Sequence, residues 1–406
     1  MTTQSRTLNV GVVGLGVAAG MVVPAVAAMP NMRLVAGADV NPRSLDIFRE
    51  RTGAKTYDSI EALCDDPEIE AIWIATPTTL HCPHVILAAE RGKHVIVEKP
   101  MAVSLDEAQR MLAAAERNGV QLVCGGSRSS SAAVRKMREV VRSGELGRVR
   151  AMTTWSATDW LLRGRRPDEL DATQGGGVAY RQAPHQVDSV RLLGGGLVRS
   201  VRGTTGQWMP PRDTAPGYFS AFLEFEDGTP ATLVYSGYGY FMASELFDPG
   251  TSGPAAPGLE GRVRARREIK TGSRDEADVK EERGLSAQRG NLAEAGSGPT
   301  GRSGSRFLAD LGLLVVSCEL GDMRQAPEGI YVYSDDGTKV VPAPEDRGRE
   351  APELNELYGA LVSGRPILHG GAWGLATLEV CLALMQSARE HREITLQHQV
   401  AVPEGW

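Results

Sequence analysis

A lysine follows a predicted strand in the tripeptide Glu98-Lys99-Pro100. The β-branched run at residues 93–97 predicts a buried strand, and Pro100 ends it while restricting Lys99 to an extended backbone. Open α/β sheets bind ligands at the carboxyl ends of their strands, so the Lys99 amine, which can take up or release a proton, is a candidate for ligand contact. A solvated lysine in a loop is the alternative that the tripeptide alone leaves open.

A glycine-rich segment follows the first predicted strand, at residues 8–13, and could bind phosphate. It matches GxGxxA, in which the first glycine permits a tight turn and the second lets the backbone approach a pyrophosphate, while the small third residue allows close packing of helix and strand. In a chain with 47 glycines such a match can arise by chance, but the preceding strand and the following helical run support it. The candidate cofactor contacts are Gly14, Gly16, Val17, Ala18 and Ala19.

Asp39 ends the second predicted strand, residues 33–38, roughly 20 residues after the glycines. A carboxylate at this place binds the ribose hydroxyls of NAD and repels the extra phosphate of NADP. The sequence therefore predicts NAD, with NADP as the minority option because Arg43 is close by. An aspartate that caps the turn before Asn41 is the alternative interpretation.

Strands and helices continue to alternate after this point. A strand at residues 70–75 precedes a helix at 80–91, and residues 120–124 form the last buried strand. This order predicts an α/β fold with a doubly wound parallel sheet, a Rossmann dinucleotide-binding domain over residues 1–124.

Three metal-ligand residue types lie close together near the start of the helix at 80–91. His81, Cys82 and His84 do not have a standard zinc spacing, and no second pair of ligands is evident, so no metal is expected. We expect His81 to begin this helix beside the cofactor.

Length and composition restrict the number of domains and the classes of binding partner. A chain of 406 residues predicts two domains, and a net charge of −6 gives no electrostatic footprint for nucleic acid or an anionic membrane. The sequence enters a strand without an apolar signal region, and we expect a cytoplasmic protein. The cysteines lack a CxxC pair and fit reduced thiols: Cys64, Cys82, Cys124, Cys318 and Cys381.

The second half predicts an α+β domain over residues 125–406. Its expected elements are a helix at 132–143, strands at 149–158, 219–225, 231–235, 330–333 and 339–341, and helices at 350–364 and 372–390. The last helix is strongly apolar and is expected to pack on this domain. Residues 248–305 are rich in Gly, Pro, Ser and mixed charge, and predict a flexible surface excursion.

Several motifs, taken jointly, resemble the Gfo/Idh/MocA oxidoreductase family. They are residues 14–19, Ala75-Thr76-Pro77, Glu98-Lys99-Pro100, residues 143–147, Gly175-Gly176-Gly177 and residues 185–188. The resemblance implies a Rossmann domain followed by a domain with an open-faced mixed sheet that commonly mediates oligomerisation. A homodimer or homotetramer is therefore expected.

The resemblance also implies site residues. Lys99 and His185 would be the catalytic pair, and the Lys-Pro peptide is often cis in this family. Contacts to the cofactor would come also from Thr76, Pro77, Glu98 and Lys99.

Arg181 stands where the family has an acidic residue, four positions before the histidine. If Arg181 and His185 share one helical face, both point into one pocket, and a guanidinium suits a substrate carboxylate. A structural ion pair of Arg181 with Asp188 or another acid is the alternative.

Within the family, the sequence is similar to the phthalate dihydrodiol dehydrogenase-like branch in residues 163–171, 175–185, 235–239 and 376–381. This implies NAD-dependent oxidation of a carboxylated cis-dihydrodiol to a catechol in aromatic-compound degradation, with Lys99 or His185 accepting the hydroxyl proton. The carboxylates would be bound by Arg181, together with Arg128, Arg163 or Arg165. A sugar, sugar-acid or cyclitol dehydrogenase is the alternative, and a noncatalytic NAD(H)-binding protein is a third possibility.

Overall fold

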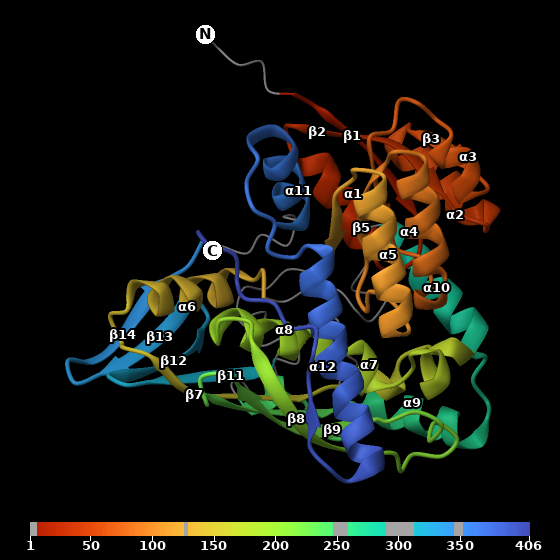
Figure 1. Cartoon of the computed structure of the whole chain (residues 1–406). Helices are drawn as coiled ribbons and strands as arrows, with labels where there is room; N and C mark the ends of the chain where they lie inside the picture. The colour runs from red at the N-terminus through yellow and green to blue at the C-terminus, as the bar shows by residue number, and fades with distance from the viewer. Residues whose placement is uncertain (1–5, 126–128, 247–258, 290–311, 345–351) are drawn as a thin grey trace.

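The computed structural model describes residues 6–125, 129–246, 259–289, 312–344 and 352–406. It contains two β-sheets with helices between them (Figure 1). Among the described residues, no helix is long and apolar enough to span a membrane.

The first sheet has six parallel strands in the order β3-β2-β1-β4-β5-β6. The strands are β1 (Leu8–Val13), β2 (Met32–Ala38), β3 (Lys55–Tyr57), β4 (Ala71–Ile74), β5 (His94–Val97) and β6 (Leu122–Cys124). Their central members are short apolar runs buried on both faces, which confirms the predicted doubly wound sheet. The strand order reverses between β1 and β4, and the carboxyl ends of strands at such a reversal are where open α/β sheets bind their ligands.

Helices pack on both faces of this sheet (Figure 1). They are α1 (Ala19–Ala28), α2 (Pro42–Thr52), α3 (Ile60–Cys64), α4 (His81–Glu90) and α5 (Leu105–Arg117). The start of α5 is set by the Ser104 hydroxyl, which accepts a hydrogen bond from the Glu107 backbone N–H at 3.2 Å. This cap places α5 five residues after Pro100, so the lysine lies in a short, fixed connection.

The second sheet has nine strands in the order β14-β13-β12-β11-β7-β10-β9-β8-β15. The strands are β7 (Val149–Ala157), β8 (Val198–Gly206), β9 (Tyr218–Phe225), β10 (Pro230–Ser236), β11 (Leu313–Cys318), β12 (Gly321–Ala326), β13 (Gly329–Ser334), β14 (Gly337–Pro342) and β15 (Ile394–Thr395). Only β7 and β10 pair in parallel among these neighbours, so the sheet is mixed, as predicted.

One face of the second sheet is covered by helices (Figure 1). They are α6 (Ala132–Ser143), α7 (Val178–Arg181), α8 (Ala183–Leu193) and α12 (Gly371–Glu390). All the residues of α8 are buried, because it lies between the sheet and α12. Any polar side chain on α8 must therefore find partners inside the protein.

The C-terminal helices join the two halves. Helix α11 (Pro352–Ser363) adds Leu354 and Leu357 to the core around β1. Helix α12 packs Leu375 and Leu378 into the core beside α5, and it also lies against β8 and α8. The expectation that the last helix packs on the second domain was therefore incomplete, because α12 has apolar residues on opposite faces and contacts both halves.

The described part of residues 248–305 is helical: α9 (Leu259–Thr271) and α10 (Glu276–Gln288). The sequence did not predict these two helices, and α10 packs on α1 and α2 of the first domain. Ion pairs, such as Lys280 with Glu169 at 2.8 Å, hold α10 in place. Sequence periodicity detects apolar stripes and therefore does not detect a helix held by ion pairs. The rest of that range, 248–258 and 290–305, lies outside the described residues.

Candidate active site

Lys99 links the two halves at the carboxyl end of β5. The Lys99-Pro100 peptide is cis, as the family resemblance implied. The Lys99 Nζ donates a hydrogen bond to the backbone oxygen of Arg181 at 2.9 Å. This contact places the amine beside the junction between α7 and α8.

His81 supports the lysine turn from inside the protein. Its Nε2 lies 2.9 Å from the Thr76 carbonyl oxygen, and its Nδ1 lies 3.0 Å from that of Pro100. The side chain is buried, and burial lowers the pKa of His81 to about 4. The expected cofactor contact is therefore corrected: the ring holds the turns after β4 and β5 together and is not exposed to a ligand.

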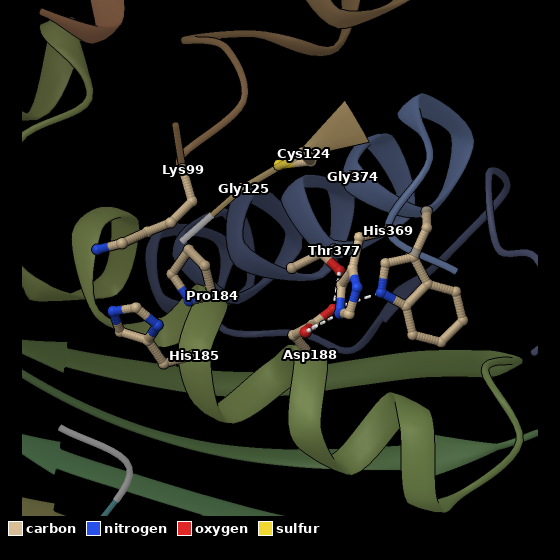
Figure 2. A pocket seen from close by; sticks show the side chains of 10 residues that line it. Lys99, Cys124, Gly125, Pro184, His185, Asp188, His369, Gly374 and Thr377 are labelled. Carbon is tan, nitrogen blue, oxygen red and sulfur yellow. Dashed lines mark hydrogen bonds and ion pairs between the residues drawn. The ribbon is translucent and has the colours of Figure 1, made fainter. Parts of the chain in front are cut away.

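His185 lies in the first turn of α8, which begins at Ala183 with Pro184 next. Lys99 and His185 line one pocket, together with Pro184 and Asp188. In Figure 2 the Lys99 amine and the His185 ring lie on the same side of Pro184, whereas Asp188 extends the opposite way, toward His369. The pocket therefore has two titratable groups at one end and an anchored carboxylate at the other.

Arg181 does not share a helix with His185. Helix α7 ends at Arg181 and α8 starts at Ala183, so the expected i and i+4 arrangement on one helix was wrong. The Arg181 guanidinium donates to the Gly175 backbone oxygen at 3.0 Å and pairs with Asp168 at 3.3 Å. The alternative of an ion pair with another acid is thus the one observed. Burial lowers the pKa of Arg181, and Asp168 partly offsets this.

Asp188 is the centre of a buried hydrogen-bond network. It accepts hydrogen bonds from Ser129 Oγ and Trp373 Nε1, and Thr377 Oγ1 lies 3.4 Å away. His369 Nε2 is 3.4 Å from the same carboxylate, and the other ring nitrogen is 2.6 Å from Glu356 Oε1. These contacts connect α8, which carries His185, to α11 and α12.

The charges in this network are balanced across His369. Although burial disfavours the imidazolium, the carboxylates of Glu356 and Asp188 raise the pKa of His369 well above its usual value. Burial also raises the pKa of nearby Glu353 to about 7. A positive His369 between two carboxylates keeps Asp188 a hydrogen-bond acceptor for the side chains around it.

The glycine turn fits a dinucleotide. Gly14 has a φ of +87°, and a Cβ there would lie 2.7 Å from the Ala75 carbonyl carbon, so the tight turn requires glycine. A Cβ on Gly16 would meet no atom within 4 Å, which leaves that backbone open to a pyrophosphate. The N-terminus of α1 follows this turn and has no side-chain cap, and its Gly20 and Met21 amides donate to the Val17 and Ala18 carbonyl oxygens.

Asp39 lies at the edge of this turn. One carboxylate oxygen accepts from the Leu15 backbone N–H at 2.6 Å, and the other accepts from the Asn41 N–H at 2.8 Å. The acid is therefore held beside the glycines, where ribose hydroxyls would be bound. Its contact with Asn41 also shows the turn role considered from the sequence, so the two interpretations are compatible.

Comparisons with known proteins agree with this geometry. Residues 8–125 match the NAD-binding Rossmann fold of the Gfo/Idh/MocA oxidoreductase family, and residues 134–243 match a Gfo/Idh/MocA C-terminal domain. A 1-carboxy-3-chloro-3,4-dihydroxycyclohexa-1,5-diene dehydrogenase from Comamonas testosteroni is 36% identical over 389 residues, covering 94% of this chain and 95% of the relative. The chain belongs to the Gfo/Idh/MocA family. It is accordingly an NAD-dependent oxidoreductase.

Two further matches show how wide this family is. A solved structure of a dehydrogenase from Bordetella bronchiseptica RB50 superposes with a TM-score of 0.84 at 36% identity, covering 96% of this chain and 100% of that one. A myo-inositol 2-dehydrogenase from Thermotoga maritima is 28% identical over 196 residues, covering 48% of this chain and 57% of that protein. Relatives of this chain are thus named for different substrates, a carboxylated dihydroxycyclohexadiene and myo-inositol.

Two of the other arginines proposed for the substrate have acidic partners in the structure. Arg165 is buried, stacks 3.8 Å from the Trp160 ring centroid and pairs with Glu169 at 3.1 Å, so its expected substrate contact is corrected to a structural role. Arg163 pairs with Asp159 at 2.9 Å. Arg128 lies outside the described residues.

The sequence did not identify His369 or the glutamates of α11. One signal was present: Glu353 and Glu356 lie next to Leu354 and Leu357 in the sequence of α11, and all four are buried. Glutamates on the apolar face of a helix indicate buried partners. The partner, His369, is not identifiable from spacing alone.

Proposed function

We propose that this protein oxidises a carboxylated cis-dihydrodiol to the corresponding catechol with NAD. The observation that carries the substrate class is the likeness, over 94% of the chain, to a dehydrogenase named for a carboxylated, chlorinated dihydroxycyclohexadiene. A lysine and a histidine that line one pocket supply the chemistry such an oxidation needs.

The chain's own part in the reaction is to take up a proton. NAD, when bound at the glycine turn, supplies the hydride acceptor. The substrate carbon that carries the reacting hydroxyl loses a hydride, and the hydroxyl loses its proton to the Lys99 amine or the His185 imidazole. The product is a ring ketone, whose tautomerisation to an aromatic diol draws the oxidation forward.

The substrate carboxylate is proposed to meet Arg181. The Arg181 backbone oxygen accepts a hydrogen bond from Lys99, which lines the pocket, so the Arg181 backbone lies next to the pocket. The competing group is Asp168, which pairs with the guanidinium at 3.3 Å. We expect Arg181→Ala to raise the KM for a carboxylated diol roughly tenfold, because a charge-assisted bidentate contact is lost. An equal loss on an uncharged diol would assign Arg181 a purely structural role.

A substrate panel tests the proposal. NADH formation would be followed with carboxylated cis-dihydrodiols, uncharged cis-dihydrodiols, myo-inositol and sugar acids, with NAD and NADP in parallel. The expected result is the highest kcat/KM for a carboxylated cis-dihydrodiol with NAD.

A sugar or cyclitol dehydrogenase is the second candidate, favoured by the similarity to a myo-inositol 2-dehydrogenase. It predicts turnover of inositol or sugar acids without a preference for the carboxylated diols. Tight NADH binding without turnover of any compound would instead indicate a noncatalytic binding protein.

Association through the nine-stranded sheet, as a homodimer or homotetramer in the cytoplasm, completes the proposal. The exposed Phe222 on β9 and Val340 on β14 offer apolar side chains on this sheet. Light scattering coupled to size-exclusion chromatography would measure the assembly, and a monomeric mass would contradict it.

A further inference from the structure

Helix α10 belongs to the second half of the chain but closes over the glycine turn. Its Gln288 side chain donates to the Leu15 backbone oxygen. A Cβ on Gly284 would be 3.9 Å from the Gly16 Cα, and a Cβ on Gly20 would be 2.8 Å from the Ala287 backbone oxygen. The small residues on both helices therefore allow a close approach, and α10 forms a wall of the cofactor site beside the Rossmann domain.

One acidic residue of α10 faces the segment that follows Asp39. Glu281 Oε1 accepts a hydrogen bond from Arg43 at 3.2 Å and one from the Asn41 side-chain amide at 3.3 Å. Arg43 is the cation that, from its position after β2, suits the 2′-phosphate of NADP. In this structure its charge is paired with Glu281.

We propose that Glu281 is a selectivity residue that favours NAD over NADP. It acts in two ways: it occupies Arg43, and it adds a second carboxylate to Asp39 beside the ribose. A 2′-phosphate placed there would be repelled by the carboxylates of Asp39 and Glu281, and the charge of Arg43 would already be paired. NADP would thus be selected against by repulsion. The inference rests on the NAD-binding assignment of the family and is independent of the substrate.

The test is direct titration of the full-length protein with NADH and with NADPH, read by the change in nicotinamide fluorescence. Glu281→Gln removes the charge while keeping an amide that fits the same space. We expect the Kd for NADPH to fall about five- to tenfold, a modest figure because the ion pair is part-exposed, and the Kd for NADH to change less than about twofold.

Glu282→Gln is the matched control. Glu282 is the exposed neighbour on the same helix and lies about 100° around it, so this variant makes the same change in net charge on a different face. It should leave both dissociation constants unchanged. Adding Arg43→Ala to Glu281→Gln should abolish the gain for NADPH, because the released cation is what binds the phosphate.

Three outcomes would overturn the proposal. No change in the NADPH affinity of Glu281→Gln would make the pair an ordinary surface ion pair. Equal gains for NADH and NADPH would mean that Glu281 only holds α10 over the site. A gain in NADPH affinity that persists when Arg43→Ala is added would mean that Arg43 does not bind the phosphate. No substrate is used, so a wrong substrate class could not produce any of these results.

Discussion

The cofactor turn and the wall of the catalytic pocket are built in contrasting ways. The turn uses backbone: a glycine at positive φ, a helix start without a side-chain cap and an aspartate at a strand end that accepts from the Leu15 amide, all between residues 14 and 39. The pocket wall uses side chains from distant segments, with Ser129, Asp188 and His369 meeting in one buried network. The first is specified by local geometry, and the second exists only when both halves of the chain are packed.

This difference separates binding from chemistry. The dinucleotide turn depends on contacts within the first domain, with α10 added over it. His185 depends on α8, which Asp188 fastens to α12 through Trp373. Substitutions in one region should therefore leave the other working, and the following experiments test that independence.

The largest effect is expected for Lys99→Ala. Removing the amine removes a proton acceptor at the reacting hydroxyl, so kcat should fall roughly 10²- to 10⁴-fold. The NADH dissociation constant should change much less than kcat, because the glycine turn and Asp39, which supply most of the expected cofactor contacts, are unaltered in this variant. Steady-state kinetics with the best diol of the panel, beside NADH titration, measure the two quantities.

Gly14→Ala is the converse of that variant. Its new Cβ would meet the Ala75 backbone, so cofactor binding should weaken while the pocket around His185 keeps its stability. Wild-type turnover in Lys99→Ala, or equal loss of NADH binding in both variants, would show that the two regions are not separable in this way.

Asp188→Asn tests the packed wall. Removing its charge leaves the His369 imidazolium facing an amide in a buried site, and the amide nitrogen lacks the acceptor capacity of the carboxylate oxygen it replaces. We expect the free energy of unfolding to drop by about 3 kcal/mol, measured by urea denaturation. NADH affinity of the folded fraction should be nearly unchanged, and kcat should fall because α8 carries His185.

Asp336→Asn is the control for that measurement. Asp336 is exposed in the turn between β13 and β14, so its substitution should change stability by less than about 0.5 kcal/mol. An Asp188→Asn protein as stable as this control would mean that the buried network contributes nothing to holding α8.

The same contrast explains what the sequence could predict. Gly14, Asp39 and Lys99 follow strand ends, and strand ends can be read from apolar runs and from the residues that stop them. The apolar runs therefore predicted that these three residues follow strands, as they do after β1, β2 and β5. Helix α8, which carries His185, was not among the predicted elements. A helix there was only a condition for Arg181 and His185 to share a face, and the structure breaks it at Gln182.

The parts that were missed depend on long-range side-chain contacts. Arg181 and Arg165 are fixed by Asp168 and Glu169, and among many charged residues no spacing rule selects those pairs. His369 lies 240 residues from Ser129, its hydrogen-bond partner. Helix α10 was missed because ion pairs, which have no periodic signature, hold it in place.

The smallest effect concerns the pH dependence of stability, to which His369 contributes. Its folded-state pKa is raised above the unfolded value of about 6.5, so the folded protein holds this proton longer than the unfolded chain does. The stabilisation is fully present below pH ~6.5 and is lost as the pH rises through the folded pKa. The slope for one group is at most about 1.4 kcal/mol per pH unit, and His369→Gln should remove it.

Glu353 contributes in a neighbouring pH window with the same sign. Its pKa is raised to about 7 by burial, so the folded protein takes up a proton between the ordinary glutamate pKa and pH 7, and stability falls as the pH rises through that interval. Glu353→Gln should flatten unfolding free energy between pH 5 and 7, whereas His369→Gln should flatten it above pH 6.5. Urea titrations at several pH values distinguish the two. If the unfolding free energy of both variants depends on pH as that of the wild type does, neither Glu353 nor His369 has a shifted pKa in the folded protein. The buried network would then differ from the glycine turn in its packing but not in its electrostatics.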